Sequence, residues 1–169
     1  MKLNLGCGGK HIPGFENLDI IYGVDAGSLP FGDNTVELIY ASHLLEHLRL
    51  SKVHAVLLEW KRVLVPDGML RVSVPDFPSL VHIYMDTGDI STILGPLYGR
   101  IDKPYSVHYT VYDFQSMAEL LLECGYRCIK RYDWHTTEHA SVDDCSQAYF
   151  PHMNKTTGIM VSLNVECRK

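Results

Sequence analysis

The chain has 169 residues, of which 46% are hydrophobic and 21% are charged, and its formal net charge at pH 7 is −5. This length predicts a single domain over residues 1–169 with an adequate hydrophobic core. The acidic balance and the lack of basic runs argue against nucleic-acid binding, and no apolar stretch is long enough for membrane insertion.

The first half of the chain is rich in short apolar runs. These predict strands at 2–5, 16–20, 22–25, 36–40 and 69–74. Apolar residues at helical spacing predict a helix over 53–64, which the turn Pro66-Asp67-Gly68 ends. Only five residues separate Asp19 from Asp25, so the N-terminal helices should be reduced.

The second half continues the alternation of strands and helices. Asp113 is a predicted N-cap of a helix that Gly125 ends, and strands follow at 126–132 and 159–165. The pattern predicts an α/β fold with a mostly parallel, seven-stranded sheet. The connections at 78–112 and 133–157 are longer than such a sheet needs. We assign the first to a substrate lid and the second to a lid or an oligomer contact, which leaves a homodimer open.

The five cysteines fit neither a disulfide framework nor a structural zinc site. Their number is odd, and no two have the Cys-x-x-Cys spacing. No charged and apolar leader opens the sequence, so we expect reduced thiols and a cytoplasmic location. Acids, imidazoles and a thiol gather loosely between residues 135 and 152, but their spacing matches no metal-binding template, and no metal site is predicted.

A glycine-rich turn follows the first predicted strand. Residues 3–9 read Leu-Asn-Leu-Gly-Cys-Gly-Gly, and Asp19 comes at the end of the second strand. Gly6 and Gly8 have no Cβ, which allows a sharp turn and a close approach to a ligand. A carboxylate such as Asp19 can accept hydrogen bonds from both hydroxyls of a ribose. Together these residues indicate a site for a nucleoside-containing cofactor.

Two common nucleotide-binding motifs do not match this turn. The nicotinamide fingerprint requires a third glycine where His11 stands. A phosphate-binding loop of the Walker type requires serine or threonine after its lysine, but Lys10 is followed by His11. A nicotinamide-dependent oxidoreductase therefore remains only a minor alternative.

Several segments, in the right order, resemble the class I S-adenosylmethionine-dependent methyltransferases. After the glycine turn come Asp-Ala-Gly-Ser-Leu-Pro-Phe at 25–31, a strand and helix start at 36–48, and a helix end, turn and strand at 60–76. The small type-11-like members with a Gly-Cys-Gly-Gly-Lys motif are the most similar. The resemblance implies an enzyme with a Rossmann-like fold, an antiparallel last strand and S-adenosyl-L-methionine as its cofactor.

The resemblance also implies roles for particular residues. Asp19 would bind the ribose, and Asp25 with the Ala26 backbone would bind the adenine. The whole implied cofactor-binding set is Asn4, Gly6, Cys7, Gly8, Asp19, Ile20, Asp25, Ala26 and Ser42.

The position after the fourth strand would face the methyl group, which makes His43 a candidate catalytic base. His108 and Asp76 are the other catalytic candidates. His43 could instead cap or pack the following helix, and Glu46 and His47 read as structural contacts of that helix.

Two residues depart from the family pattern. Asn4 stands where an acid is usual, and Lys10 where a third glycine is frequent. We expect methyl transfer to a small-molecule acceptor, such as a hydroxyl of a sugar or of another metabolite. A non-catalytic cofactor-binding module or assembly partner with the same fold remains an alternative. The sequence leaves open which acceptor atom is methylated and whether a divalent metal assists.

Overall fold

A six-stranded sheet with the order β2-β1-β3-β4-β8-β5 forms the centre of the computed structural model, which describes residues 1–103 and 105–169. Strands β1 to β4 run parallel, and β8 is antiparallel to both β4 and β5. The strands are β1 (Lys2–Leu5), β2 (Glu16–Leu18), β3 (Val36–Ser42), β4 (Leu64–Pro75), β5 (Arg127–Arg131) and β8 (Ser162–Arg168). The predicted α/β fold with an antiparallel last strand is confirmed.

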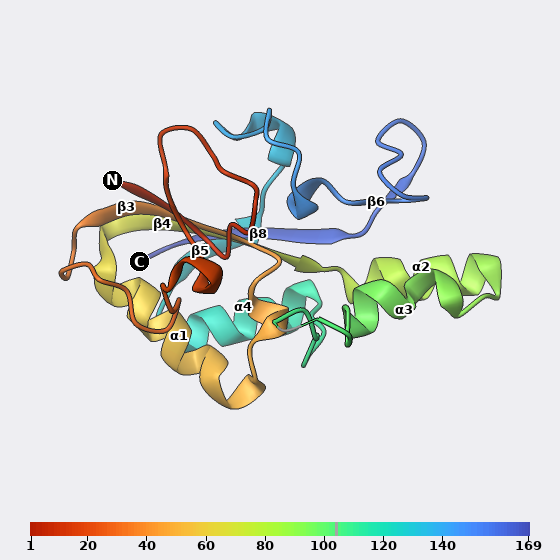
Figure 1. The fold of residues 1–169 in the computed structure, drawn as a ribbon, viewed down its shortest axis with the longest axis horizontal. Helices are drawn as coiled ribbons and strands as arrows, with labels where there is room; N and C mark the ends of the chain where they lie inside the picture. Colours follow the sequence, from red (N-terminus) through yellow and green to blue (C-terminus); the bar gives the residue numbers. More distant parts are fainter. Residues whose placement is uncertain (104) are drawn as a thin grey trace.

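Helices α1 (Leu50–Val63) and α4 (Phe114–Glu123) cover one face of the sheet (Figure 1). The segment 133–157 lies on the other face, where the Tyr40 hydroxyl of β3 donates to Asp144 at 2.7 Å. Helices α2 (Phe77–Thr87) and α3 (Ser91–Tyr98) extend beyond one end of the sheet. Near them, β6 (Tyr149–Phe150) and β7 (Ile159–Met160) form a small second sheet.

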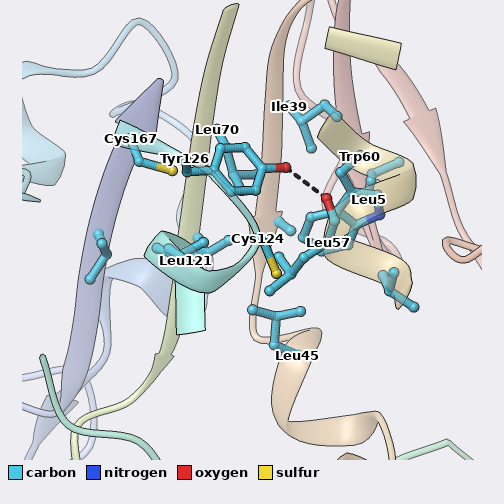
Figure 2. Close-up of a cluster of buried hydrophobic side chains, with 14 of the residues drawn as sticks. Leu5, Ile39, Leu45, Leu57, Trp60, Leu70, Leu121, Cys124, Tyr126 and Cys167 are labelled. Carbon is cyan, nitrogen blue, oxygen red and sulfur yellow. Dashed lines mark hydrogen bonds between the residues drawn. The ribbon is translucent and has the colours of Figure 1, made fainter. Parts of the chain in front are cut away.

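The main core lies between the sheet and the two covering helices. Leu57 and Trp60 of α1 and Leu121 of α4 are fully buried there. Tyr126, which follows α4, spans the gap between the helices, and its hydroxyl donates to the Leu57 carbonyl at 2.9 Å (Figure 2). This bond ties the C-terminal part of the fold to α1, whose N-terminal half borders the functional site described below.

We expect Tyr126→Phe to lower the free energy of unfolding by about 1–2 kcal/mol, because it removes a buried hydrogen bond and leaves the apolar packing intact. Urea unfolding of the variant and of the parent measures this difference. Tyr84→Phe, at an exposed position of α2, is the matched control and should be neutral. Equal stability of the Tyr126 variant and the parent would contradict a stabilising role of the Tyr126–Leu57 hydrogen bond.

The sheet has one strand fewer than predicted, because residues 22–25 are not a strand. After β2 the Asp19 side chain accepts from the Ile21 N–H and caps a 3₁₀ helix, Ile20–Tyr22. Gly23, with φ of 83°, then turns the chain. The prediction of reduced N-terminal helices is confirmed, since residues 1–49 form no α-helix.

The connection predicted at 78–112 is also more regular than expected, because it contains most of α2 and all of α3. The predicted cap at Asp113 is confirmed: its carboxylate accepts from the Ser116 N–H at 2.7 Å, and the Ser116 hydroxyl accepts from the Asp113 N–H. Among the helices of the described residues, none has the length and apolarity required to cross a membrane.

Candidate active site

A cavity of about 640 Å³ opens at the carboxyl ends of β1, β2 and β3. Gly6 comes from the end of β1, Asp19 from the end of β2, and His43 from the end of β3. The loop 25–27 and the side of α1 close the cavity. The carboxyl ends of the strands are where ligands bind in open, mostly parallel sheets.

Gly6 is required by the shape of the first turn. Its φ is +65°, and a Cβ there would lie only 2.9 Å from Cδ1 of Leu44, which also lines the cavity. An L-residue would be strained by its backbone and would push Leu44 aside.

We therefore expect Gly6→Ala to weaken binding of S-adenosylhomocysteine by about tenfold, the equivalent of 1–2 kcal/mol of strain. Calorimetric titration measures the affinity. Gly9→Ala is the matched control, since a Cβ there meets nothing within 4 Å. A normal affinity for Gly6→Ala would show that this turn does not shape the cofactor site.

Asp19 is held at the cavity edge by two backbone donors. Its Oδ2 accepts from the Gly8 N–H at 2.8 Å, and its Oδ1 accepts from the Ile21 N–H at 3.0 Å. A carboxylate has about four acceptor sites, so two remain for a ligand. The half-buried acid is thus fixed in orientation and still able to accept hydrogen bonds.

The loop that follows supplies a second acid. Asp25 accepts from the Gly27 N–H at 2.8 Å, which closes a tight turn. The Ala26 carbonyl accepts from the indole N–H of the buried Trp60 at 2.8 Å. This bond fastens the loop to α1, so that Asp25 and Ala26 border the cavity in a defined position.

His43 lies between the cavity and a buried carboxylate. Its backbone has φ of 51°, and its N–H still donates to Ser73 of β4 at 2.8 Å. Its ring atom Nδ1 lies 3.0 Å from Oε1 of Glu46, which is fully buried, and Nε2 lies 3.2 Å from the Ser162 hydroxyl. A non-glycine residue with positive φ is uncommon, and such strain is frequent at functional sites.

The charges around Glu46 shift several pKa values. Burial raises the pKa of Glu46, but the neighbouring imidazoles of His43 and His47 outweigh burial, so its pKa is lowered and it stays ionised. Burial and the Glu46 charge raise the pKa of Tyr112, which stays a neutral donor. Burial lowers the pKa of His108, against the opposing charge of Glu46, and this imidazole is neutral at pH 7.

Buried polar atoms without an aligned hydrogen bond gather at the carboxyl ends of β3 and β4. Among the described residues they include Ser42 Oγ, both carboxylate oxygens of Glu46, Asp76 Oδ1 and the Tyr112 hydroxyl. Buried polar groups are nearly always paired in folded proteins, and exceptions in one place indicate a binding site for a polar ligand.

The structure brings six of the candidate residues to the first cavity and leaves the other six outside it. Those at the cavity are Gly6, Asp19, Ile20, Asp25, Ala26 and His43. Those outside its lining are Asn4, Cys7, Gly8, Ser42, Asp76 and His108. For both sets of residues, contact with a ligand remains a prediction.

Most residues of the outer set have visible structural partners. The Asn4 amide donates to Asn17 Oδ1 at 2.8 Å and to the Lys10 carbonyl at 2.9 Å, so it braces the glycine turn. Gly8 orients Asp19. Asp76 precedes α2 and accepts from the Ser79 hydroxyl at 2.7 Å.

Glu46 and His47, which the sequence indicates as structural contacts of the helix, both lie in the cluster around the site. His47 lines the cavity, and its ring centroid lies 4.7 Å from that of His108. The only available signal was local: two ionisable residues follow His43 within an apolar run. The approach of His108 depends on the fold of the intervening 60 residues and could not be seen.

A second cavity, of about 570 Å³, lies between α2, α3 and the segment 143–153. Its walls are largely apolar and include Leu80, Ile83 and Phe150. Two contacts join it to the cluster described above. The carbonyl of Pro96, in its wall, accepts from the Nδ1–H of His108 at 2.7 Å. Val161, also in its wall, precedes Ser162, the partner of His43.

Comparison with known proteins gives a family match over part of the chain. Residues 12–72 match the family model described as a methyltransferase domain. No curated protein matches the chain.

Solved structures share the fold over almost the whole length. An S-adenosylmethionine-dependent methyltransferase of Thermotoga maritima, described as a possible histamine N-methyltransferase, has a TM-score of 0.61 at 14% identity and covers 99% of this chain and 81% of its own. A methyltransferase of Archaeoglobus fulgidus has a TM-score of 0.56 at 14% identity, with 99% and 85% covered. One from Mesorhizobium loti has a TM-score of 0.55 at 12% identity, with 99% and 90% covered.

At these identities the solved structures show the fold alone, whereas the family model adds a match of sequence. The cavity at the strand ends lies where such a fold places its ligand. The matched segment 12–72 supplies Asp19, Asp25 and His43 of that cavity. Residues 12–72 are therefore similar to a methyltransferase domain, the whole chain shares the fold of S-adenosylmethionine-dependent methyltransferases, and both findings support S-adenosylmethionine as the cofactor.

Proposed function

We propose that this protein is an S-adenosylmethionine-dependent methyltransferase that methylates a hydroxyl group of a small molecule, with His43 as the general base. The observation that carries the proposal is the position of His43, which lines the first cavity while its Nδ1 contacts the buried Glu46 at 3.0 Å. A base that is oriented by a buried carboxylate suits an acceptor that must lose a proton during transfer.

The residues of the first cavity fit S-adenosylmethionine. The turn at Gly6 has no room for a Cβ, as expected where a backbone borders a ligand. Asp19 and Asp25, which line the cavity, would accept hydrogen bonds from the ribose and the adenine, and Val56 and Leu48 add apolar side chains to its lining. The volume falls within the range of about 300–1,000 Å³ that is typical of small-molecule sites. When bound, the cofactor supplies an electrophilic methyl group on a sulfonium.

His43 and Glu46 would then divide the work on the proton. His43 Nδ1 faces Glu46, and Nε2 would exchange its contact with the Ser162 hydroxyl for the acceptor hydroxyl and take the proton of the acceptor. The Glu46 carboxylate would stabilise the imidazolium that results. Alignment of the acceptor oxygen with the methyl group supplies the rest of the acceleration.

The second cavity is our candidate for the acceptor site. Two of its wall residues adjoin the cluster: Pro96 contacts His108, and Val161 precedes Ser162, the partner of His43. Its walls combine apolar side chains with polar groups such as Thr92 and Asp143. This lining suits a molecule with hydroxyls and apolar faces, and sugars have both.

The test is a screen of hydroxyl, amine and thiol acceptors that measures release of S-adenosylhomocysteine. We expect turnover with hydroxyl compounds, and we expect the second-cavity variant Ile83→Trp to raise KM for them without changing the affinity for S-adenosylhomocysteine. Turnover confined to amines or thiols would overturn the proposed acceptor class. An unchanged KM in Ile83→Trp would overturn the proposed acceptor site.

A further inference from the structure

A carboxylate and two imidazoles converge beside the first cavity. One potential ligand atom from each of Glu46, His47 and His108 lies within 4.8 Å of the other two. Glu46 is fully buried, and in the described part of the chain neither of its oxygens has an aligned hydrogen bond. A buried charge is costly unless it is paired or coordinates a metal ion. The ion-pair contact of 3.0 Å with His43 Nδ1 is made by Oε1 of Glu46, which leaves Oε2 for another partner.

The two imidazoles are oriented as metal ligands usually are. His47 Nδ1 lies 3.1 Å from the Val107 carbonyl, and His108 Nδ1 lies 2.7 Å from the Pro96 carbonyl. A carbonyl only accepts, so in each ring Nδ1 carries the proton and Nε2 has the free lone pair. Metal-binding histidines typically donate their other ring N–H to a backbone carbonyl or a carboxylate in this way.

We propose that Glu46, His47 and His108 form a binding site for one divalent transition-metal ion. Two imidazole nitrogens and one carboxylate oxygen favour ions such as Zn²⁺, Co²⁺, Mn²⁺ or Fe²⁺ over Mg²⁺ and Ca²⁺, which prefer oxygen ligands. Three protein ligands leave coordination positions open for water or for a substrate oxygen. Binding of the ion would require rotation of the three side chains from their present spacing, in which the ligand atoms lie within 4.8 Å of one another.

The site would place the ion next to the base. His43 and the ion would share Glu46, with one carboxylate oxygen for each. An acceptor hydroxyl bound to the ion would be easier to deprotonate, because a cation stabilises the alkoxide. This role rests on the proposed methylation of a hydroxyl, whereas binding of the ion does not.

The test is titration of chelator-treated enzyme with Co²⁺, followed by visible absorption and by calorimetry. We expect one Co²⁺ per chain with d–d bands of a nitrogen- and oxygen-ligated ion, displaced by Zn²⁺ and not by Mg²⁺. In His108→Ala the affinity should fall by more than about tenfold, and His47→Gln, which keeps the helix surface polar, should behave in the same way. His82→Ala, at an exposed position of α2, is the matched control and should bind normally.

Unchanged Co²⁺ binding in folded His108→Ala or His47→Gln, or no binding by the parent enzyme, would overturn the metal site. Binding of Co²⁺ without any effect on turnover of a hydroxyl acceptor would keep the site and overturn its role in methyl transfer. These outcomes separate failure of the metal site from failure of the proposed reaction.

Discussion

His43→Asn should lower kcat for a hydroxyl acceptor by about 10²–10⁴, the usual contribution of a general base. Asparagine tolerates the positive φ of this position better than most residues, so the variant removes the imidazole and keeps the backbone turn. The affinity for S-adenosylhomocysteine should change little, because His43 is only one of the many residues that line the cavity. Release of S-adenosylhomocysteine at saturating substrate measures kcat.

The matched control is His82→Ala, which removes an exposed imidazole paired only with Asp86. The kcat of Glu46→Gln should lie between the kcat of His43→Asn and that of the parent, because this variant keeps the base and removes its carboxylate partner. A normal kcat in His43→Asn would contradict the assigned base and would move the role to His108 or Asp76.

Asp19→Ala should weaken binding of S-adenosylhomocysteine by about ten- to a hundredfold. Hydrogen bonds to a charged group contribute about 1.5–3 kcal/mol each, and 1.4 kcal/mol corresponds to a factor of ten. Part of the loss would come from the protein itself, since Asp19 also fixes the Gly8 and Ile21 N–H groups. Calorimetric titration gives the affinity, and circular dichroism checks the fold.

Asp19→Asn keeps one of the two backbone contacts. Its amide oxygen can still accept from the Ile21 N–H, so the 3₁₀ helix keeps its cap, while the bond from the Gly8 N–H and the charge that would face the ribose are lost. We expect an intermediate affinity for Asp19→Asn. Asp86→Ala, on the exposed side of α2, is the control and should bind as the parent does. Equal affinities of Asp19→Ala and the parent would exclude Asp19 from the ribose site.

Local features of the fold were predictable because they depend on neighbouring residues. Gly6 and Gly8 predict a turn because they have no Cβ atom, and both have positive φ in the structure. Asp113 predicts a helix cap because its side chain can accept from the backbone N–H of Ser116, and the structure has this bond. The predicted strand at 22–25 was wrong for a similar local reason: the Asp19 cap and Gly23 favour a 3₁₀ turn over an extended chain.

The composition of the site was less predictable, because it depends on contacts between distant segments. The placement of Asn4 outside the cavity is decided by Asn17, which its amide contacts across the strand pair. Glu46 interacts electrostatically with His43, which is close in the sequence, and with Tyr112 and His108, which are far along the chain. Periodicity and motif spacing carry no information about such encounters.

The most direct test of the account is calorimetric titration of the parent enzyme and of Gly6→Ala with S-adenosylmethionine and S-adenosylhomocysteine, with NAD as the control ligand. The account predicts micromolar binding of the first two ligands, weaker binding by Gly6→Ala and no binding of NAD. Binding that is equally tight in both proteins would place the cofactor elsewhere. No binding of either methionine derivative by the parent enzyme would contradict the assignment of the first cavity.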